Sequence, residues 1–345
     1  MGLLPLPTID PVSLLGAPGL HWGLIGPGTI AGDFTRAIHR HTRQRITRVA
    51  SRDTARAQAF IQRIGIDALP GTVEQLLADP DIDVVYISTP HAQHRDDALR
   101  AIAAGKHVLV EKPLALDAAG ARDISAAATA AGVFAMEAMW TAFLPRSEAI
   151  RLLIADGALG EIRQVEASFG GRADPTEEPR LWDPTVGGGA LLDIGVYPIA
   201  LAVSLLGVPQ SVTARGRVSS EGVDARVRLL LDYAGGAGAT LMTALDTVMD
   251  NRAVIAGEHA LVTLDQEFYA PGGFEFRTEQ DRVRWEDPSG IRGRDGLAYQ
   301  AAAVAAAVLD GRLQAAQHPL TAAVAALDVI DEALRQLRLE AGLSA

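Results

Sequence analysis

The sequence predicts an α/β protein with two parts. The first is an N-terminal Rossmann domain, a doubly wound parallel sheet, and the second is a C-terminal α+β domain with a large, mainly antiparallel open sheet. From His21 to Glu137, apolar strand-like runs alternate with helical patterns, which is typical of parallel strands joined by crossover helices. The first run leads straight into a glycine-rich turn. Beyond Val208, apolar and polar residues alternate, as in antiparallel strands with one solvated face.

The N-terminal part is expected to contain strands near 21–26, 46–51, 83–88, 107–111 and 133–137. Helical patterns fill the intervals at 30–40, 53–64, 72–78, 92–104 and 117–131. Capping residues agree with these bounds, because side chains that can accept from free backbone amides stand at the starts and glycines stand at the ends. The expected N-caps are Asp53, Thr72 and Asp117, and the expected stops are Gly65, Gly105 and Gly132.

The C-terminal part begins with a helical stretch at 145–156, a broken glycine-rich segment at 170–190 and a helix through 190–206. Strands are expected at 211–218, 225–233, 238–246, 251–256 and 260–265, and two alanine-rich amphipathic helices at 295–310 and 320–341. We therefore expect a loosely ordered, flexible extension over 1–20, a Rossmann domain over 21–144, and a substrate and oligomerisation domain over 145–345.

Composition narrows the function classes. The chain has 345 residues, a formal net charge of −11 and no cysteine. The acidic balance argues against nucleic acid or an anionic membrane as the main partner, and the lack of cysteine excludes disulfides, thiolate metal sites and a cysteine nucleophile. Residues 1–20 have no basic segment and no long apolar run, so we expect no signal peptide and a cytoplasmic protein acting on small molecules.

A Gly-x-Gly-x-x-Ala turn follows the first apolar run. Gly26 allows the tight strand-to-helix turn, Gly28 leaves room for phosphates, and the small Ala31 lets the helix pack closely on the strand. The helix N-terminus then directs its amides, from Thr29 and Ile30 onward, at an anion. This pattern predicts a dinucleotide site, although a plain βα turn would give a similar pattern.

The end of the second strand indicates which dinucleotide binds. Here a ribose with free hydroxyls calls for an acidic residue and a 2′-phosphate for a basic one. The chain has Ser51 and Arg52, a hydroxyl and a guanidinium that suit a phosphate, which favours NADP(H). The alternative is that Asp53 binds the ribose and the cofactor is NAD; Asp53 resembles a helix cap more closely.

Two further motifs follow the next strands, Thr89-Pro90 with His94 and Glu111-Lys112-Pro113. Both stand at the carboxyl ends of parallel strands, the edge where open α/β sheets bind ligands. Thr89, Pro90, His94, Glu111 and Lys112 are therefore expected near the nicotinamide end of the cofactor. Taken singly, His94 could be a surface helix residue and Glu111-Lys112 a solvated pair.

Together with the run from Gly187 to Pro198, these motifs resemble the glucose-fructose oxidoreductase, inositol dehydrogenase and related sugar dehydrogenase (Gfo/Idh/MocA) family from residue 21 to the C-terminus. The resemblance implies a Rossmann domain, a C-terminal domain whose open sheet supports homodimers or homotetramers, and Lys112 at the active site, with Pro113 in the cis form. Many members have histidine where this chain has Tyr197. Tyrosine there is similar to the branch of dimeric dihydrodiol dehydrogenase and NADP-dependent xylose dehydrogenase, which leaves the substrate open among aldoses, cyclic diols and dicarbonyl compounds.

Oxidation of a CH–OH group needs a base for the hydroxyl proton beside the nicotinamide. A neighbouring ammonium favours the phenolate form of a tyrosine. We therefore predict Tyr197 as the acid/base, Lys112 as its electrostatic partner and ligand of the substrate oxygen, and Asp193, four residues earlier, as an orienting group on the same helix face. The alternative is a structural one, in which Tyr197 packs in the core and Asp193 caps or forms an ion pair.

Aromatic rings stack on the C–H faces of sugars or cyclic diols, and arginine binds their oxygens. The candidates for substrate contact are Trp140, Phe143, Arg180 and Trp182, although large aromatic residues are often core residues instead. The histidines do not accompany carboxylates at ligand spacing, so no metal site is expected.

Two other functions stay open. One is a non-catalytic NADP-binding sensor of the same fold, and the other is an oxidoreductase that retains and recycles its nicotinamide. Lys112, Asp193 and Tyr197 together favour an enzyme, because a sensor has no use for a base.

Overall fold

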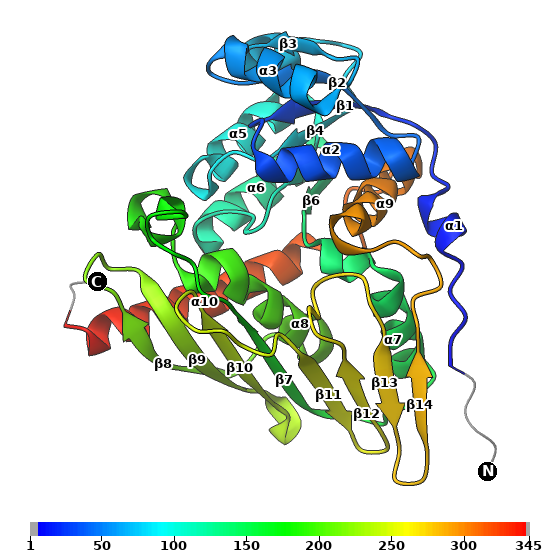
Figure 1. The fold of residues 1–345 in the computed structure, drawn as a ribbon, viewed down its shortest axis with the longest axis vertical. Helices are drawn as coiled ribbons and strands as arrows, with labels where there is room; N and C mark the ends of the chain where they lie inside the picture. The colour runs from blue at the N-terminus through cyan, green and yellow to red at the C-terminus, as the bar shows by residue number, and fades with distance from the viewer. Residues whose placement is uncertain (1–5, 343–345) are drawn as a thin grey trace. The chain divides into compact units, whose positions relative to one another are not determined.

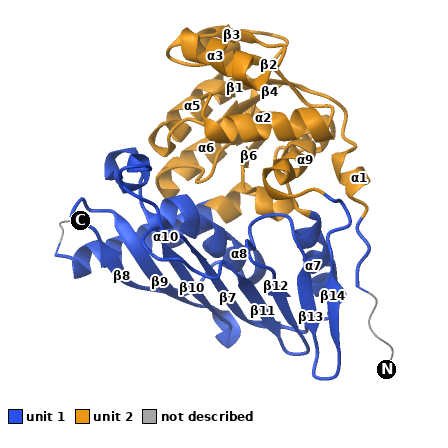
Figure 2. Ribbon diagram, in the orientation of Figure 1, with its two compact units in different colours: residues 1–9, 145–290, 324–345 blue, residues 10–144, 291–323 orange. Residues whose placement is uncertain are grey.

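The computed structural model describes residues 6–342 and divides them into two compact units (Figure 2). One unit comprises residues 10–144 and 291–323, and the other comprises residues up to Ile9, 145–290 and those from Val324 onward. Figure 1 labels the helices and strands of both. The sequence-predicted α/β class is confirmed, since each unit is built on one large sheet.

The sheet of the first unit has six strands in the order β3-β2-β1-β4-β5-β6, which is the Rossmann order. All its neighbouring strands pair in parallel. The strands are β1 (His21–Ile25), β2 (Arg45–Ala50), β3 (Leu69–Gly71), β4 (Val84–Ile87), β5 (His107–Val110) and β6 (Ala135–Glu137). The apolar runs form the strands because both faces of a parallel sheet are covered by helices; β4 is buried throughout.

The helices of this unit are α1 (Pro11–Leu15), α2 (Thr29–His41), α3 (Thr54–Ile64), α4 (Val73–Leu77), α5 (His91–Ala103), α6 (Ala118–Ala131) and α9 (Leu297–Leu309), with the 3₁₀ turns η1 (Trp140–Phe143) and η6 (Gly293–Gly296). The expected N-caps are confirmed, because Asp53, Thr72 and Asp117 each accept from an amide of the first turn. Gly65 and Gly132 end their helices in the left-handed conformation.

The sheet of the second unit has eight strands in the order β14-β13-β12-β11-β7-β10-β9-β8. Only the β7–β10 pair is parallel, so the predicted, mainly antiparallel sheet is confirmed. Its strands are β7 (Ile162–Gly170), β8 (Ser211–Val218), β9 (Asp224–Asp232), β10 (Gly238–Ala244), β11 (Ala253–Gly257), β12 (Leu261–Leu264), β13 (Phe274–Arg277) and β14 (Arg282–Trp285). From Ala225 onward, side chains of β9 alternate between buried and exposed, as expected for a sheet with one covered face.

The helices of this unit include α7 (Pro145–Ala155), a π-helical turn η4 (Leu191–Gly195) that continues into α8 (Val196–Leu206), and α10 (Leu320–Glu340), which begins in the other unit. Two short 3₁₀ turns, η2 (Pro179–Trp182) and η3 (Pro184–Val186), lie in the glycine-rich segment, and η5 (Ala234–Gly236) joins β9 to β10. The helix α8 packs against β7 and β10, so it covers the centre of the sheet.

One helical segment of the described residues, Pro184–Leu206, is long and apolar enough to cross a membrane by length and composition alone. Within it, 67% of the apolar window is buried inside the protein. Because α8 contacts the sheet through this surface, its apolar composition is explained by packing in the core.

Residues 1–5 of the expected N-terminal extension lie outside the described residues. Residues 6–20 contain the helix α1, which Asp10 caps at its start. Ile9 and Leu20 are buried, and the Trp285 indole donates to the Pro7 carbonyl at 3.0 Å.

Candidate active site

The turn between β1 and α2 is built around two glycines with different tasks. Gly26 has φ +93°, and a Cβ there would lie 2.7 Å from the Ser88 carbonyl carbon and the Thr89 nitrogen. Only glycine fits this backbone. Gly28 has an ordinary φ of −91° at the N-cap of α2, and a Cβ there would meet nothing within 4 Å. Open space therefore lies over the start of α2, where the first amides of the helix, from Thr29 and Ile30 onward, have no helical partner.

This cradle fits a dinucleotide pyrophosphate. A helix N-terminus combines free N–H donors with the positive end of the helix dipole. Ala31 is fully buried, which brings the helix close to the sheet, as the sequence predicted. Because Gly28 has no side chain, it leaves the space for the anion open.

The end of β2 presents the residues expected at the ribose. Ser51 is buried and Arg52 is exposed. The Asp53 carboxylate accepts from the Ala55 amide at 2.9 Å as the N-cap of α3. Asp53 is therefore engaged as a cap, which weakens the alternative that it binds the ribose.

His94 joins the loops after β4 and β5. Its Nδ1 lies 2.8 Å from the Pro113 carbonyl oxygen and its Nε2 lies 2.8 Å from the Thr89 carbonyl oxygen. The ring is fully buried on α5, and burial lowers its pKa. His94 thus contacts the main chain of Thr89, which precedes Pro90, and of Pro113, which follows Lys112. It therefore holds both loops in place.

The Glu111-Lys112 pair is not a solvated pair. Glu111 is buried, and its Oε1 accepts from the Tyr86 hydroxyl at 2.5 Å. Its Oε2 accepts from the Lys112 amide at 3.2 Å. Burial raises the pKa of Glu111, while Tyr86 and Lys112 act against that rise. The Lys112-Pro113 bond is cis, as the family resemblance implied.

The second unit carries the predicted acid/base residue. Tyr197 is buried at the start of α8, and its ring lies 5.6 Å from the rings of both Phe169 and Tyr269. Phe169 and Tyr269 stack on each other at 4.0 Å with an interplanar angle of 7°. Sequence reasoning missed both residues, because Phe169 lies in an unpredicted strand, β7, and Tyr269 lies in a loop.

Asp193 lies in the π-helical turn η4, so its spacing from Tyr197 is not that of an α-helix face. It forms an ion pair with Arg180 at 3.1 Å, and the Arg180 side chain is 47% exposed. Trp182 is partly buried against a cluster that includes Leu181, and Ile194, the neighbour of Asp193 in the chain, packs against the same cluster. Two of the four substrate candidates, Arg180 and Trp182, therefore belong to the segment that includes Asp193.

The other two candidates belong to η1 in the Rossmann unit. Trp140 and Phe143 are 2% and 5% exposed. The Arg294 guanidinium lies 5.7 Å from the centre of the Trp140 ring, a cation–π contact on one face of the indole. Their burial makes them part of the core of that unit.

Asp224, which no sequence pattern indicated, binds the turn that leads into the Tyr197 helix. This buried carboxylate accepts from the Leu191 amide at 2.7 Å. A Cβ at Gly189, whose φ is +131°, would lie 2.0 Å from Asp224 Oδ1. Glycine is thus required at position 189 so that the chain can close around this carboxylate. Burial raises the pKa of Asp224 to about 7.

A parallel Rossmann sheet with a phosphate cradle, joined to a unit with an open antiparallel sheet, defines a two-part oxidoreductase that binds a dinucleotide. The model of the oxidoreductase family with an NAD-binding Rossmann fold matches residues 20–139, and that of the GFO/IDH/MocA C-terminal domain matches residues 147–263. The chain belongs to this GFO/IDH/MocA family of oxidoreductases.

Relatives and solved structures agree with this assignment. The trans-1,2-dihydrobenzene-1,2-diol dehydrogenase of Mus musculus is 33% identical, over 92% of this chain and 97% of the mouse protein. A 3-ketoreductase of Actinomadura kijaniata, solved with NADP and TDP-benzene, is 28% identical with a TM-score of 0.76, over 92% of this chain and 97% of that one. The aldose-aldose oxidoreductase of Caulobacter crescentus, solved with glycerol, is 26% identical with a TM-score of 0.82, over 93% and 98%.

Proposed function

We propose that the protein is an NADP(H)-dependent dehydrogenase or reductase that acts on a CH–OH group of a sugar, polyol or cyclic diol. The observation that carries the proposal is the open cradle at Gly28 on the N-terminus of α2. The names of its relatives, a diol dehydrogenase, a ketoreductase crystallised with NADP and an aldose oxidoreductase, support the same reaction class.

The α2 amides and Gly28 would hold the pyrophosphate, and Ser51 and Arg52 would hold a 2′-phosphate. Thr89, Pro90 and Glu111 would lie at the nicotinamide end, with His94 supporting their loops through the main chain. When bound, the nicotinamide supplies the hydride acceptor or donor. NADP is favoured over NAD because a guanidinium at the end of β2 adds charge and paired donors where a 2′-phosphate would lie.

Tyr197 takes the proton of the substrate hydroxyl during oxidation and returns it during reduction. Lys112 stabilises the phenolate and donates to the substrate oxygen. Lys112 and Tyr197 belong to different units, so their joint action is proposed from their chemistry and is tested below. Asp193 orients the site through its ion pair with Arg180.

Arg180 and Trp182 are the stronger candidates for substrate contact, since Arg180 is half exposed. The indole nitrogen of Trp182 is buried and has no partner among the described residues. We also propose Trp140 and Phe143 as aromatic contacts of the substrate. Because both are buried, replacing either one with alanine should change the stability of the protein as well as the KM for substrate.

The test compares Lys112→Ala and Tyr197→Phe with the unaltered protein. Each substitution should lower kcat at least about 100-fold, the range expected for a lost acid/base, while the Kd for NADPH by calorimetry changes less than about three-fold. Loss of NADPH binding together with activity would mean that these residues position the nucleotide. Normal binding without turnover on any substrate by the unaltered protein would favour a sensor.

An oxidoreductase that retains its cofactor is distinguished by purification. Nucleotide that stays with the protein through gel filtration, and is oxidised and reduced in place by added sugars, would support that alternative. Nucleotide that exchanges freely with the buffer would support the release of cofactor in each turnover.

We also propose that the protein forms a homodimer or homotetramer through the open face of the eight-stranded sheet and that it works in the cytoplasm. Leu230 on β9 and Met242 on β10 are 53% and 38% exposed on this sheet. A covered sheet face would explain these side chains. Light scattering of Leu230→Glu should report a smaller species than the unaltered protein, and equal masses would contradict the sheet as the interface.

A further inference from the structure

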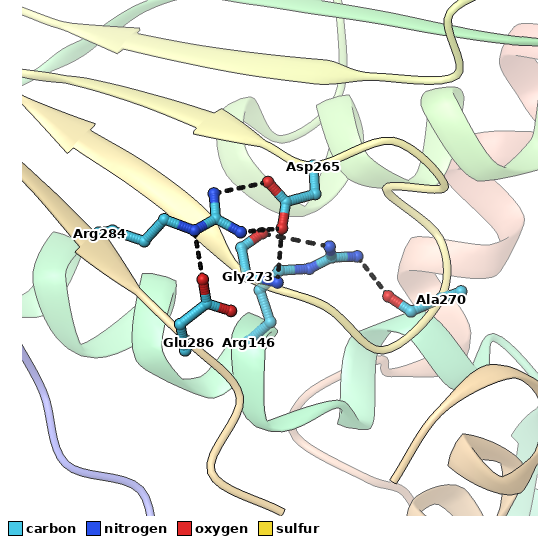
Figure 3. A network of polar contacts seen from close by, with 6 residues as sticks. All are labelled: Arg146, Asp265, Ala270, Gly273, Arg284 and Glu286. Atoms are coloured by element: carbon cyan, nitrogen blue, oxygen red, sulfur yellow. Dashed lines mark hydrogen bonds and ion pairs between the residues drawn. The ribbon is translucent and has the colours of Figure 1, made fainter. Parts of the chain in front are cut away.

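The loop between β12 and β13 is held from inside by a buried arginine. Arg146, the second residue of α7, has no exposed surface. Its Nη2 donates to the Phe268 carbonyl and, at 2.6 Å, to the Ala270 carbonyl; its Nη1 lies 3.5 Å from the Gly273 carbonyl. Figure 3 shows this guanidinium directed at the main chain of the loop. One side chain therefore fixes a loop of nine residues, 265–273, at three points.

The charge of Arg146 is retained in this environment. Burial lowers its pKa to about 10, and the nearby Asp265 and Asp287 act against that fall. Asp265 does not bind Arg146 directly; it accepts from the Gly273 amide at 2.9 Å and forms a two-pronged ion pair with Arg284. Figure 3 shows that Arg284 approaches Asp265 from the opposite side and also contacts Glu286. Arg284 thus binds only the first residue of the loop, through the Asp265 carboxylate, whereas Arg146 binds the carbonyls on either side of Tyr269 in its middle.

The middle of the same loop touches the proposed acid/base. Tyr269 stands between the two carbonyls that accept from Nη2, those of Phe268 and Ala270. Its ring stacks on Phe169 and lies 5.6 Å from the Tyr197 ring. The Phe268 ring is fully buried and meets the rings of Tyr269 and Phe169 edge-on, with centroids at 5.9 and 6.4 Å. A shift of the loop would therefore move the rings that confine Tyr197.

We propose that Arg146 is a positioning residue for Tyr197, acting through the 265–273 loop and the Tyr269 ring. This inference rests on the proposed role of Tyr197. Leaving the arginine buried without a direct carboxylate partner is costly. Its carbonyl contacts define a single loop conformation, which would hold Tyr197 in its reactive position. Such precision matters because a displacement of about 1 Å at a reacting group can cost about 100-fold in rate.

The test uses Arg146→Met, Arg146→Lys, Tyr269→Ala and Tyr269→Phe, with Arg284→Met as the matched control. Arg146→Met and Tyr269→Ala should lower kcat about 10- to 100-fold with less than about a three-fold change in the Kd for NADPH. Arg146→Lys should recover part of the loss because an ammonium can donate to two carbonyls, and Tyr269→Phe should keep most of the activity because it keeps the ring. Arg284→Met should change kcat less than about three-fold.

A second readout does not depend on activity. The chain has five tyrosines, so 3-fluorotyrosine labelling gives few ¹⁹F resonances, which single Tyr→Phe variants assign. Arg146→Lys should shift or broaden the resonances of Tyr197 and Tyr269, whereas Arg284→Met should leave them in place. Should Arg146→Met fail to fold, Arg146→Lys and Tyr269→Ala carry the same test.

Unchanged resonances in Arg146→Lys together with full activity in Tyr269→Ala would overturn the inference. Shifted resonances with unchanged kcat would also overturn it, provided that Tyr197→Phe is inactive in parallel. If Tyr197→Phe keeps its activity, the proposed function fails by its own control, and the fluorine spectra still report whether Arg146 sets the position of the two rings.

Discussion

Replacing Gly28 with alanine should separate cofactor binding from folding. The Gly28 backbone, with φ −91° and ψ −164°, is open to any L-residue, and a Cβ would meet no atom within 4 Å. Alanine is a poorer N-cap than glycine, which lowers the free energy of unfolding by a few tenths of a kcal/mol or more. Alanine also reduces the conformational entropy of the unfolded chain, which raises the free energy of unfolding by about 0.4–1 kcal/mol. We therefore expect the free energy of unfolding to change by less than about 1 kcal/mol.

Binding should respond differently, because the new methyl group would project into the space over the α2 amides. It would keep the pyrophosphate from approaching the backbone, the purpose of this glycine in a dinucleotide turn. We expect the Kd for NADPH to rise at least about ten-fold, which corresponds to about 1.4 kcal/mol. Calorimetry measures the Kd, and urea unfolding measures stability in the same preparation.

Gly26→Ala is the contrasting variant. Its φ of +93° costs about 1–3 kcal/mol for a residue with a side chain. Contacts of 2.7 Å with the Ser88 carbonyl carbon and the Thr89 nitrogen add an overlap that backbone atoms cannot relieve without moving β1 from β4. We expect at least about 2 kcal/mol of lost stability. Unchanged NADPH binding by Gly28→Ala would refute the placement of the phosphates, and full stability of Gly26→Ala would refute the role of the turn.

Three more substitutions test other parts of the structure. Arg52→Ala should weaken NADPH binding at least about ten-fold and NADH binding little, and equal weakening in calorimetry would contradict the 2′-phosphate assignment. His94→Phe should lose about 1–3 kcal/mol of stability, because the carbonyl that accepts from the single N–H of the neutral ring loses its donor; unchanged urea unfolding would contradict that role. Asp224 keeps its proton up to about pH 7 in the folded chain, whereas its ordinary pKa is 3.8. The protonated form therefore adds roughly 4 kcal/mol to the free energy of unfolding. This stabilisation is fully present below pH 4 and is lost as the pH rises through 7. Asp224→Asn should flatten the fall in melting temperature over that window, and an unchanged slope would show that another group causes it.

The Rossmann unit was largely predictable because its signals are local. Strands such as β4 that are buried on both faces are apolar, and the caps Asp53, Thr72 and Asp117 mark helix starts by their own chemistry. Of its strands, only β3 was missed; its three residues include Pro70, an unfavourable strand residue that is tolerated at the edge of a sheet. The short helix α1 was missed as well, since residues 1–20 were expected to form a loosely ordered extension.

The open-sheet unit was predicted less completely. The prediction missed β7, the strand that joins the two halves of the sheet, because polar residues such as Gln164, Glu166 and Ser168 interrupt its apolar residues, although Gly157 and Gly160 form a turn before its start. It also missed β13 and β14, which are four residues each and rich in charge. Strands this short are defined by their neighbours in the sheet more than by their own pattern.

For the candidate site, sequence motifs led to the proposal of residues whose chemistry is visible in the residue type, such as Lys112 and Tyr197. They did not identify Arg146 or Asp224, because a charged residue after a proline or at a strand start is usually a surface residue. The burial of these two groups is set by segments far away in the chain: Arg146 by the loop after β12, and Asp224 by the turn before α8. No local pattern contains that information.

The measurement that tests the central claim most directly is calorimetry of NADPH against NADH, followed in the same sample by absorbance at the reduced-nicotinamide band with aldoses, inositols and cyclic diols. We predict selective NADPH binding and turnover with at least one member of this panel, which would also name the substrate class. Binding of neither nucleotide would contradict the dinucleotide site, and selective binding without any turnover would contradict the assignment as a dehydrogenase.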